Sequence, residues 1–132
     1  MTERRMRHLV LKLLEPIGAF PVENTVASGC PDICTALGWI ELKVAKRPAK
    51  DTTPVKIDLR RQQRIWLRRW TELEQKSWVL IWINGLWLLY YGHIAAEKLG
   101  KISFWQLFDE AKDSWGLPPT RESLIKALTN LY

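Results

Sequence analysis

Residues 23–48 read ENTVASGCPDICTALGWIELKVAKRP and contain the pattern on which the predicted sheet depends. Two short runs in it alternate apolar and polar side chains and meet at Gly38, which predicts a hairpin of two strands. Asp32, Glu41 and Lys43 stand in these runs where packing would favour Val or Ile. Charged side chains are rarely buried without a partner. The three residues therefore raise a question about function.

Strand geometry predicts that these charged residues meet. Side chains of a strand point alternately to opposite faces, so Glu41 and Lys43 share one face of the strand predicted at 39–45. If the strand at 32–37 pairs with it antiparallel through the turn, Asp32 lies opposite the region around Glu41 and Lys43. Two carboxylates and a lysine are therefore expected to converge.

A helix predicted at 59–74 adds a fourth polar residue. Its apolar stripe has helical spacing and consists of Leu59, Trp66, Trp70 and Leu73. Gln63 occupies a position of this stripe where the pattern calls for an apolar residue. A strand, a helix and a following strand normally form a right-handed crossover with the two strands parallel. We therefore expect the helix to cover the sheet, with Gln63 facing Glu41 and Lys43.

The remaining pattern predicts an α/β fold with a mixed sheet flanked by helices. Asn84-Gly85 joins two apolar runs and is a strong hairpin signal. The other predicted elements are helices at 4–15, 94–99, 104–112 and 121–131, strands at 78–83 and 86–91, and an exposed loop at 46–58. At 132 residues the chain is expected to form one domain, 1–132, with a core at about 4–92 and a helical extension at 93–132.

Composition narrows the class of partner. The chain is 47% hydrophobic and 26% charged, which is typical of a globular protein. Its net charge of +6 favours a polyanion such as DNA, or an anionic membrane surface. No run approaches the roughly 18 apolar residues of a membrane span, so a cytoplasmic location without membrane insertion is expected. Cys30 and Cys34 are too few for a disulfide framework or a zinc site.

The chemistry of the converging residues indicates phosphodiester hydrolysis. Two neighbouring carboxylates repel each other unless a cation lies between them. Oxygen ligands suit Mg²⁺ or Mn²⁺, which also accept the oxygens of a substrate phosphate. Such a cation acidifies its water and neutralises charge that develops on the phosphate. Lys43 would hold the attacking water or the phosphate oxygen.

The same residues carry a resemblance. Asp32 followed by Glu41-Leu42-Lys43 resembles the signature of PD-(D/E)xK nucleases. More closely, ENTVASGCPD, GWIELK and LRRQQRIWLRRW are similar to the stand-alone, phage-type members of the VRR-NUC branch. This similarity covers residues 20–92. It implies a restriction-endonuclease-like αβββαβ core and a Mg²⁺- or Mn²⁺-dependent deoxyribonuclease of a bacterium or a phage-infected cell.

The resemblance also implies individual roles. Asp32, Glu41 and the Leu42 carbonyl would bind the metal, Lys43 would be the catalytic lysine, and Gln63 an active-site residue of the helix. Glu23 would be a further acid near the metal, although an acid before a strand is often only a turn or cap residue. Relatives of this branch resemble Holliday-junction resolvases, so branched DNA and a homodimer are expected. A two-fold dimer presents two sites to the symmetric strands of a junction.

Basic residues suggest where DNA would bind. Arg60, Arg64 and Arg68 repeat every four residues without acids to pair them, and a polyanion would relieve their repulsion. Lys46 and Arg47 in the preceding segment are further candidates. A solvated helix surface is the competing interpretation, since that is the usual setting of charge runs.

The polar and aromatic residues are each compatible with a second role. Asp32, Glu41 and Lys43 could form an ion pair on a solvated strand face, and the chain could be a non-catalytic DNA-binding or DNA-packaging protein that keeps the nuclease fold. The tryptophans on the apolar stripes are interpreted as core residues rather than base-stacking platforms. Finally, the last helix or an apolar cluster could supply a dimer interface; the cluster is Phe104, Trp105, Leu107 and Phe108.

Overall fold

The computed structural model of the chain describes residues 1–22 and 31–130. Its helices are α1 (Glu3–Leu13), the 3-10 turn η1 (Glu15–Ile17), α2 (Arg61–Glu72), α3 (Gly92–Lys98), α4 (Phe104–Asp109) and α5 (Arg121–Thr129). Its strands are β1 (Phe20–Pro21), β2 (Ile33–Thr35), β3 (Gly38–Ala45), β4 (Ser77–Ile83), β5 (Leu86–Tyr91) and β6 (Asp113–Trp115). The predicted α/β class with a mixed sheet is confirmed.

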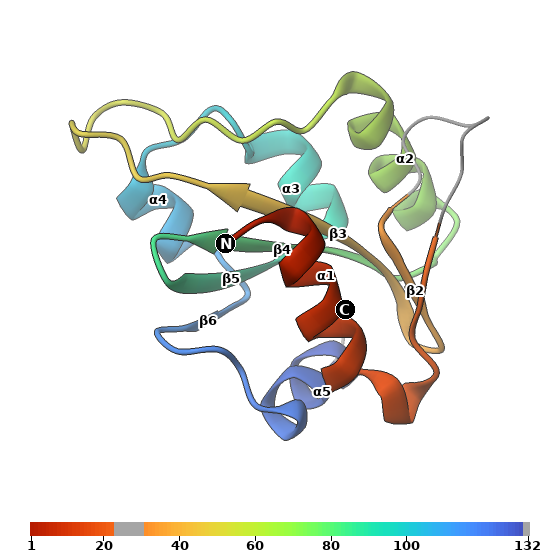
Figure 1. The fold of residues 1–132 in the computed structure, drawn as a ribbon. Helices are drawn as coiled ribbons and strands as arrows, with labels where there is room; N and C mark the ends of the chain where they lie inside the picture. The colour runs from red at the N-terminus through yellow and green to blue at the C-terminus, as the bar shows by residue number, and fades with distance from the viewer. Residues whose placement is uncertain (23–30, 131–132) are drawn as a thin grey trace.

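The strands form one six-stranded sheet whose order follows the chain, β1-β2-β3-β4-β5-β6. β3 and β4 are parallel, and every other neighbouring pair is antiparallel. Helix α2 makes the crossover between β3 and β4, as the sequence pattern predicts (Figure 1). This connection places α2 over β3, the strand that carries Glu41 and Lys43.

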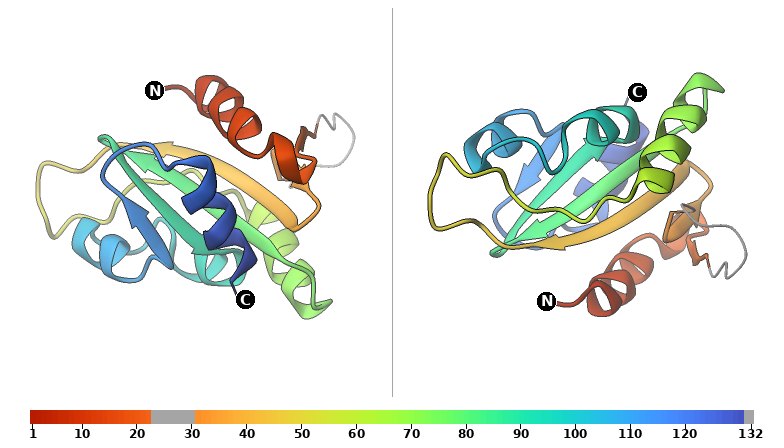
Figure 2. Two further views of the ribbon diagram at one scale, coloured as in Figure 1. Left: turned by 90° about the horizontal axis from the view of Figure 1, so that it is seen from below. Right: turned by 90° about the horizontal axis from the view of Figure 1, so that it is seen from above.

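Helices cover both faces of the sheet, which gives three layers (Figures 1 and 2). One hydrophobic core joins the sheet to α2, α3 and α4, and the other joins the opposite face to α1 and α5. The side chains of β4 divide accordingly, with Val79, Ile81 and Ile83 in the first core and Trp78 and Leu80 in the second. Strands buried on both faces explain why the sequence shows nearly continuous apolar runs here.

Two tight turns fix the register of the strands. Asn84 and Gly85 join β4 to β5 with φ angles of 48° and 86°, the conformation favoured in two-residue hairpins. Gly38 lies where the β2–β3 turn meets the backbone before β4. A Cβ atom there would lie 2.4 Å from the Lys76 carbonyl oxygen, so only glycine fits. Both predicted hairpins are confirmed.

The C-terminal part differs from the helical extension expected at 93–132. The helix predicted at 104–112 ends at Asp109, and Asp113–Trp115 forms β6, a sixth strand paired with β5. Three residues with a charge among them show no strand periodicity, so the sequence pattern could not reveal β6. Ser103 and Thr120 are the N-caps of α4 and α5, since each side chain accepts a backbone N–H. Within the described residues, no helix has the length and apolarity needed to cross a bilayer.

Candidate active site

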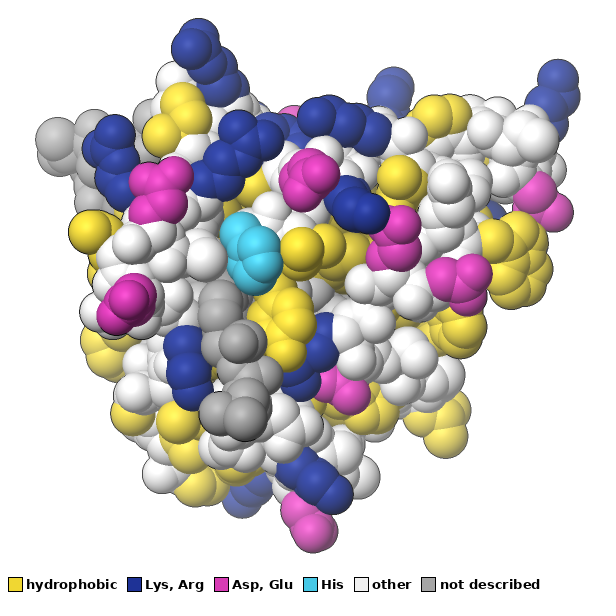
Figure 3. Space-filling model, turned by 180° about the vertical axis from the view of Figure 1, so that it is seen from behind, with side chains coloured by type: hydrophobic (Ala, Val, Ile, Leu, Met, Phe, Trp, Pro, Cys, Tyr) yellow, Lys and Arg dark blue, Asp and Glu magenta, His cyan; other side chains and the backbone are white. Residues whose placement is uncertain are grey.

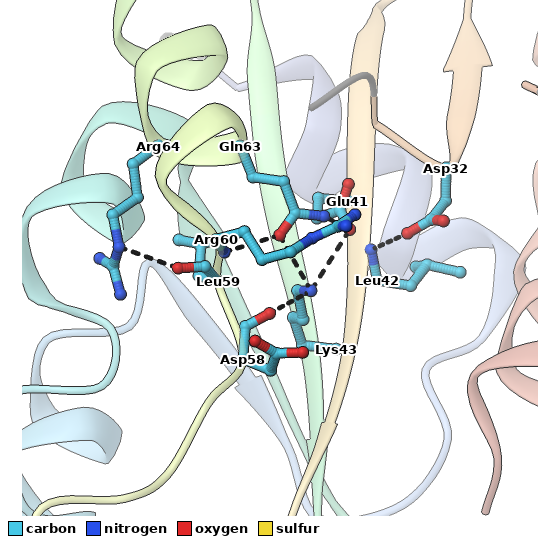
Figure 4. A network of polar contacts seen from close by, with 9 residues as sticks. All are labelled: Asp32, Glu41, Leu42, Lys43, Asp58, Leu59, Arg60, Gln63 and Arg64. Atoms are coloured by element: carbon cyan, nitrogen blue, oxygen red, sulfur yellow. Dashed lines mark hydrogen bonds and ion pairs between the residues drawn. The ribbon is translucent and has the colours of Figure 1, made fainter. Parts of the chain in front are cut away.

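Asp32, just before the start of β2, lies beside Glu41 of β3. Ile33 pairs with Ile40 in the antiparallel ladder, so the preceding residue, Asp32, lies opposite Glu41. Burial and the nearby Asp32 charge both raise the pKa of the Glu41 carboxyl. The Leu42 N–H also donates to Asp32 Oδ2 at 2.8 Å, which fixes the orientation of this carboxylate (Figure 4). The expected approach of the two acids is observed.

Lys43 completes the polar face of β3. Its Nζ donates to the Asp58 carbonyl oxygen and, at 3.2 Å, to Gln63 Oε1. It lies 3.7 Å from Glu41 Oε1, and both side chains are more than nine-tenths buried. Neutral acceptors therefore hold the ammonium group beside the Glu41 carboxyl (Figure 4).

Gln63 connects these groups to helix α2. Its Nε2 donates to Glu41 Oε1 at 3.0 Å, while its Oε1 accepts from Lys43 and, at 2.9 Å, from the Arg60 N–H. The last bond also satisfies a free N–H at the start of the helix. Gln63 is 5% exposed, whereas the neighbouring Gln62 is exposed. The structure thus brings together the four residues that the sequence pattern singled out.

Burial gives Glu41 an unusual protonation. Loss of solvation, followed by repulsion from Asp32, raises the pKa of Glu41 to about 9, although the Lys43 charge lowers it. At neutral pH Glu41 therefore holds a proton. The contact with Lys43 is then one of an ammonium group with a neutral acid. A divalent cation bound in place of this proton would offset the repulsion between the ionised Asp32 and Glu41 carboxylates.

Glu3 and Asp58 are two further acids near these charges, and neither belongs to the sequence motif. Burial raises the pKa of Glu3, in the first turn of α1, and the Lys43 charge opposes this effect while Asp32 and Asp58 add to it. Glu3 therefore senses the same charges as Glu41. Asp58 precedes α2 and lies beside Lys43 (Figure 4). Each is distant in sequence from the motif, so no spacing pattern could have identified it.

The donors present suit a hard divalent cation. Residues of an extended strand point their N–H and C=O to the same side. Since the Leu42 N–H points to Asp32, the Leu42 carbonyl lies on that same edge, next to the carboxyl pair. These oxygen ligands are the type that Mg²⁺ and Mn²⁺ prefer. In the described part of the chain, no three His, Cys, Asp or Glu side chains form a metal-binding group. Glu23 and Cys30 lie outside the described residues.

The candidate DNA contacts fall into two groups. Arg64 is engaged within the fold, since its guanidinium donates to the carbonyl oxygens of Leu59, Ala96 and Leu99 at 2.7–3.0 Å. Its N–H groups bond to carbonyl oxygens at the C-terminal end of α3. The helical spacing predicted a DNA contact for Arg64, but in the structure its side chain binds within the fold. Arg60 and Arg68 are exposed.

Other cations surround the start of α2. Arg47 lies 4.2 Å from the centre of the Phe104 ring, close to Trp105, and pairs with Asp51 at 3.0 Å. Part of the predicted apolar dimer cluster is therefore in contact with Arg47. Figure 3 shows Lys and Arg side chains gathered along the edge formed by α2 and the loop before it. The exposed cations of these segments are Lys46, Arg47, Lys50, Lys56, Arg60, Arg61, Arg68 and Arg69.

Comparisons with protein-family models, with curated proteins and with solved structures give no match for this chain. The functional interpretation therefore depends on the geometry of the polar cluster and on the sequence motif.

Proposed function

We propose that the protein is a divalent-cation-dependent endonuclease that hydrolyses DNA phosphodiester bonds. The observation that supports this proposal is the network of Asp32, Glu41, Lys43 and Gln63, mostly buried, in a sheet face that is mainly apolar. Burying such a network costs free energy that apolar residues would not cost. A catalytic function accounts for that cost, and a solvated ion pair does not.

The finer fold assignment supports the same proposal. The order α1, β1, β2, β3, α2, β4 matches the αβββαβ arrangement of PD-(D/E)xK nucleases, with three antiparallel strands and a parallel fourth. In this assignment β5, β6 and α3 to α5 are additions to the core. The network then lies where β3 continues past the first residue of β2, on the β2 side of β3.

Each residue has a defined task in this proposal. Asp32, Glu41 and the Leu42 carbonyl would hold Mg²⁺ or Mn²⁺, which lowers the pKa of a bound water and neutralises charge on the phosphate. Lys43 donates to a phosphate oxygen or orients the water that attacks phosphorus as a P–O bond breaks. Gln63 bridges Glu41 and Lys43 and keeps both at fixed positions.

The exposed cations of α2 and the preceding loop would bind the DNA backbone. Lys46, Arg47, Arg60 and Arg68 are the predicted contacts that remain available on this edge. Contacts of this kind neutralise phosphates and release counterions, so binding would weaken steeply as salt is added.

Cleavage assays separate the nuclease from its main rival, a non-catalytic DNA-binding or packaging protein. Plasmid and branched DNA would be incubated with Mg²⁺ or Mn²⁺ and wild type, Lys43→Ala or Lys101→Ala, which removes an exposed lysine elsewhere. We expect cleavage by wild type and Lys101→Ala, and at least a hundredfold less by Lys43→Ala, the order of effect of removing a catalytic group. Equal nicking by all three would favour the rival.

Holliday-junction cleavage by a homodimer is the finer form of this proposal. Sedimentation of the free protein would give its oligomeric state, and a fixed four-way junction, a linear duplex and a 5′ flap would be compared as substrates. A dimer that prefers the junction supports a resolvase. A monomer that prefers flaps removes the resolvase and leaves the chemistry of Asp32, Glu41 and Lys43 intact.

A further inference from the structure

Three tryptophans form a compact aromatic cluster between β3 and α2. Trp66 and Trp70 stack with ring centres 4.5 Å apart and planes at 16°, and Trp39 meets both edge-on at 5.5 Å. All three are only half-buried. The assignment of these tryptophans to the core is therefore incomplete, since part of each reaches the surface.

A cavity of about 380 Å³ opens beside this cluster. Trp39 and Trp70 form its aromatic wall, the β2–β3 turn closes another side, and Glu74, Gln75 and Lys76 line the rim. The cavity thus combines flat aromatic surface with a carboxylate, an amide and an ammonium group. Its volume is within the range of pockets that bind small ligands.

The aromatic wall is fixed in place before any ligand arrives. The Lys76 carbonyl accepts both the Trp39 N–H and Trp70 Nε1, each at 3.1 Å. The turn at Gly38 packs against the same carbonyl, with no room for a Cβ atom. A rigid wall loses little conformational freedom when a flat ligand stacks on it.

The cavity adjoins the candidate active site. Trp39 and Glu41 project from the same face of β3, two residues or about 7 Å apart. On α2, Trp66 and Trp70 follow Gln63 by about one and two turns. A DNA strand whose phosphate lies at Asp32 and Glu41 would therefore bring a neighbouring nucleotide to the cavity.

We propose that this cavity receives an unpaired nucleobase of the DNA strand that occupies the candidate active site. This inference rests on the proposed nuclease function and defines its substrate class. Aromatic rings bind bases by stacking without strong sequence preference. Lys76 at the rim and exposed Arg69 on α2 would pair with the adjoining phosphates. A base within a continuous duplex is stacked on its neighbours and would have to be extruded first.

The proposal predicts that the protein prefers DNA with an unpaired nucleotide next to the cleaved bond. Branch points, flaps and overhangs present such nucleotides, and a continuous duplex does not. If the tryptophan cluster were purely structural, the protein would bind DNA with a base at that position and DNA with an abasic sugar there with equal affinity.

Binding to two matched DNA probes tests this inference. Both are labelled duplexes with a short single-stranded overhang, one with normal bases and one with abasic sites, measured by anisotropy without divalent cations. We expect wild type to bind the abasic probe about fivefold to a hundredfold more weakly, the range of one stacked base. Equal affinities would overturn the proposal without the need for any variant.

Two variants locate the effect. Trp70→Leu, checked for folding by circular dichroism, should bind both probes with nearly equal affinity. Trp105→Leu, which removes a tryptophan that is 52% exposed elsewhere, should keep the wild-type difference. An undiminished preference in folded Trp70→Leu would place base recognition outside this cavity and contradict the proposal.

Cleavage of the same probes with Mn²⁺ separates this inference from the nuclease function. A base preference in binding without cleavage would support the cavity and remove the nuclease assignment. Cleavage that depends on Lys43 but is equal on both probes would support the nuclease and overturn the cavity.

Discussion

β3 and β4 lie side by side in parallel register, yet their side chains on one face differ in kind. Glu41 pairs with Val79, and Lys43 pairs with Ile81. All four are buried beneath the helices that cover this face. On β4 the contacts are those of an apolar core, whereas on β3 they are hydrogen bonds to Gln63 and the neighbouring backbone. The same sheet face thus serves packing on one strand and polar chemistry on the next.

The polar network on β3 costs free energy that the apolar contacts of β4 do not. Buried charged networks rarely stabilise a fold more than apolar residues of similar volume would. The raised pKa of Glu41 shows the cost directly, since burial and Asp32 keep this carboxyl protonated. β4 shows that the fold itself tolerates apolar residues at this depth. The network on β3 is therefore best explained by function.

The largest expected effect comes from making β3 resemble β4. The triple variant Glu41→Val, Lys43→Ile, Gln63→Leu should abolish DNA cleavage because it removes the proposed catalytic groups. Its free energy of unfolding should stay equal or rise by about 1–4 kcal/mol, because an apolar cluster replaces a buried polar one. Cleavage assays and urea unfolding measure the two effects. A large loss of stability would show that the network holds the fold together.

The free energy of unfolding should depend on pH because the Glu41 carboxyl is buried. The folded protein binds the Glu41 proton more tightly than the unfolded chain, because the pKa is raised from 4.5 to about 9. The metal-free protein should therefore lose stability as pH rises from about 5 to 9, by at most about 1.4 kcal/mol per pH unit from this group.

Urea unfolding at several pH values, with a chelator present, checks this prediction. Glu41→Gln carries no titrating proton at this position and should flatten the profile. An identical pH dependence in wild type and Glu41→Gln would mean that the carboxyl is not held protonated by the fold.

Arg64 and Arg68 sharpen the comparison within α2, since one arginine serves the fold and the other the surface. Arg64→Ala should lower the free energy of unfolding by about 1.5–3 kcal/mol, because three backbone carbonyls lose a charged donor. Arg68→Ala, one turn away, should change it by less than about 0.5 kcal/mol but weaken DNA binding. Urea unfolding and DNA titration of both variants measure these effects. A larger loss of stability in Arg68→Ala than in Arg64→Ala would contradict the prediction.

The smallest effect concerns the end of α2. Glu74 has a φ of 59°, a left-handed conformation that favours glycine, and its N–H bonds to the Thr71 carbonyl in the helix cap. Glu74→Gly should raise the free energy of unfolding by up to about 1 kcal/mol, because the strain of a left-handed side chain is removed. Glu72→Gly, inside the last turn, is the control and should destabilise by a similar amount. A lower free energy of unfolding in Glu74→Gly would contradict the prediction that the backbone at Glu74 is strained.

Local sequence signals predicted the parts of the fold that depend on them. Asn84-Gly85 and Gly38 mark turns whose geometry few other residues allow, and the apolar runs of β4 and β5 identify buried strands. The crossover helix follows from the order of the elements, and it places Gln63 above Glu41. These features needed no knowledge of distant contacts.

Other features depend on contacts that no local pattern shows. β1 and β6 contain two and three residues and exist only because a longer strand lies beside them. The spacing of Arg64 on its helix does not show that the end of α3 lies against it. The charge of Glu3, in α1, acts with those of Lys43 and Asp32 only in the folded chain. Helical spacing likewise does not separate a buried tryptophan from one at the rim of a cavity.

Titration calorimetry with Mn²⁺ near pH 7, in two buffers of different ionisation enthalpy, tests most directly whether β3 carries a cation site in place of core. Wild type should bind Mn²⁺ and release about one proton per cation, because the proton held by Glu41 must leave. Asp32→Asn should bind at least about tenfold more weakly, while Asp109→Asn, an exposed control, should match wild type. No binding by wild type at millimolar Mn²⁺, or unchanged binding by Asp32→Asn, would contradict a cation site at Asp32 and Glu41.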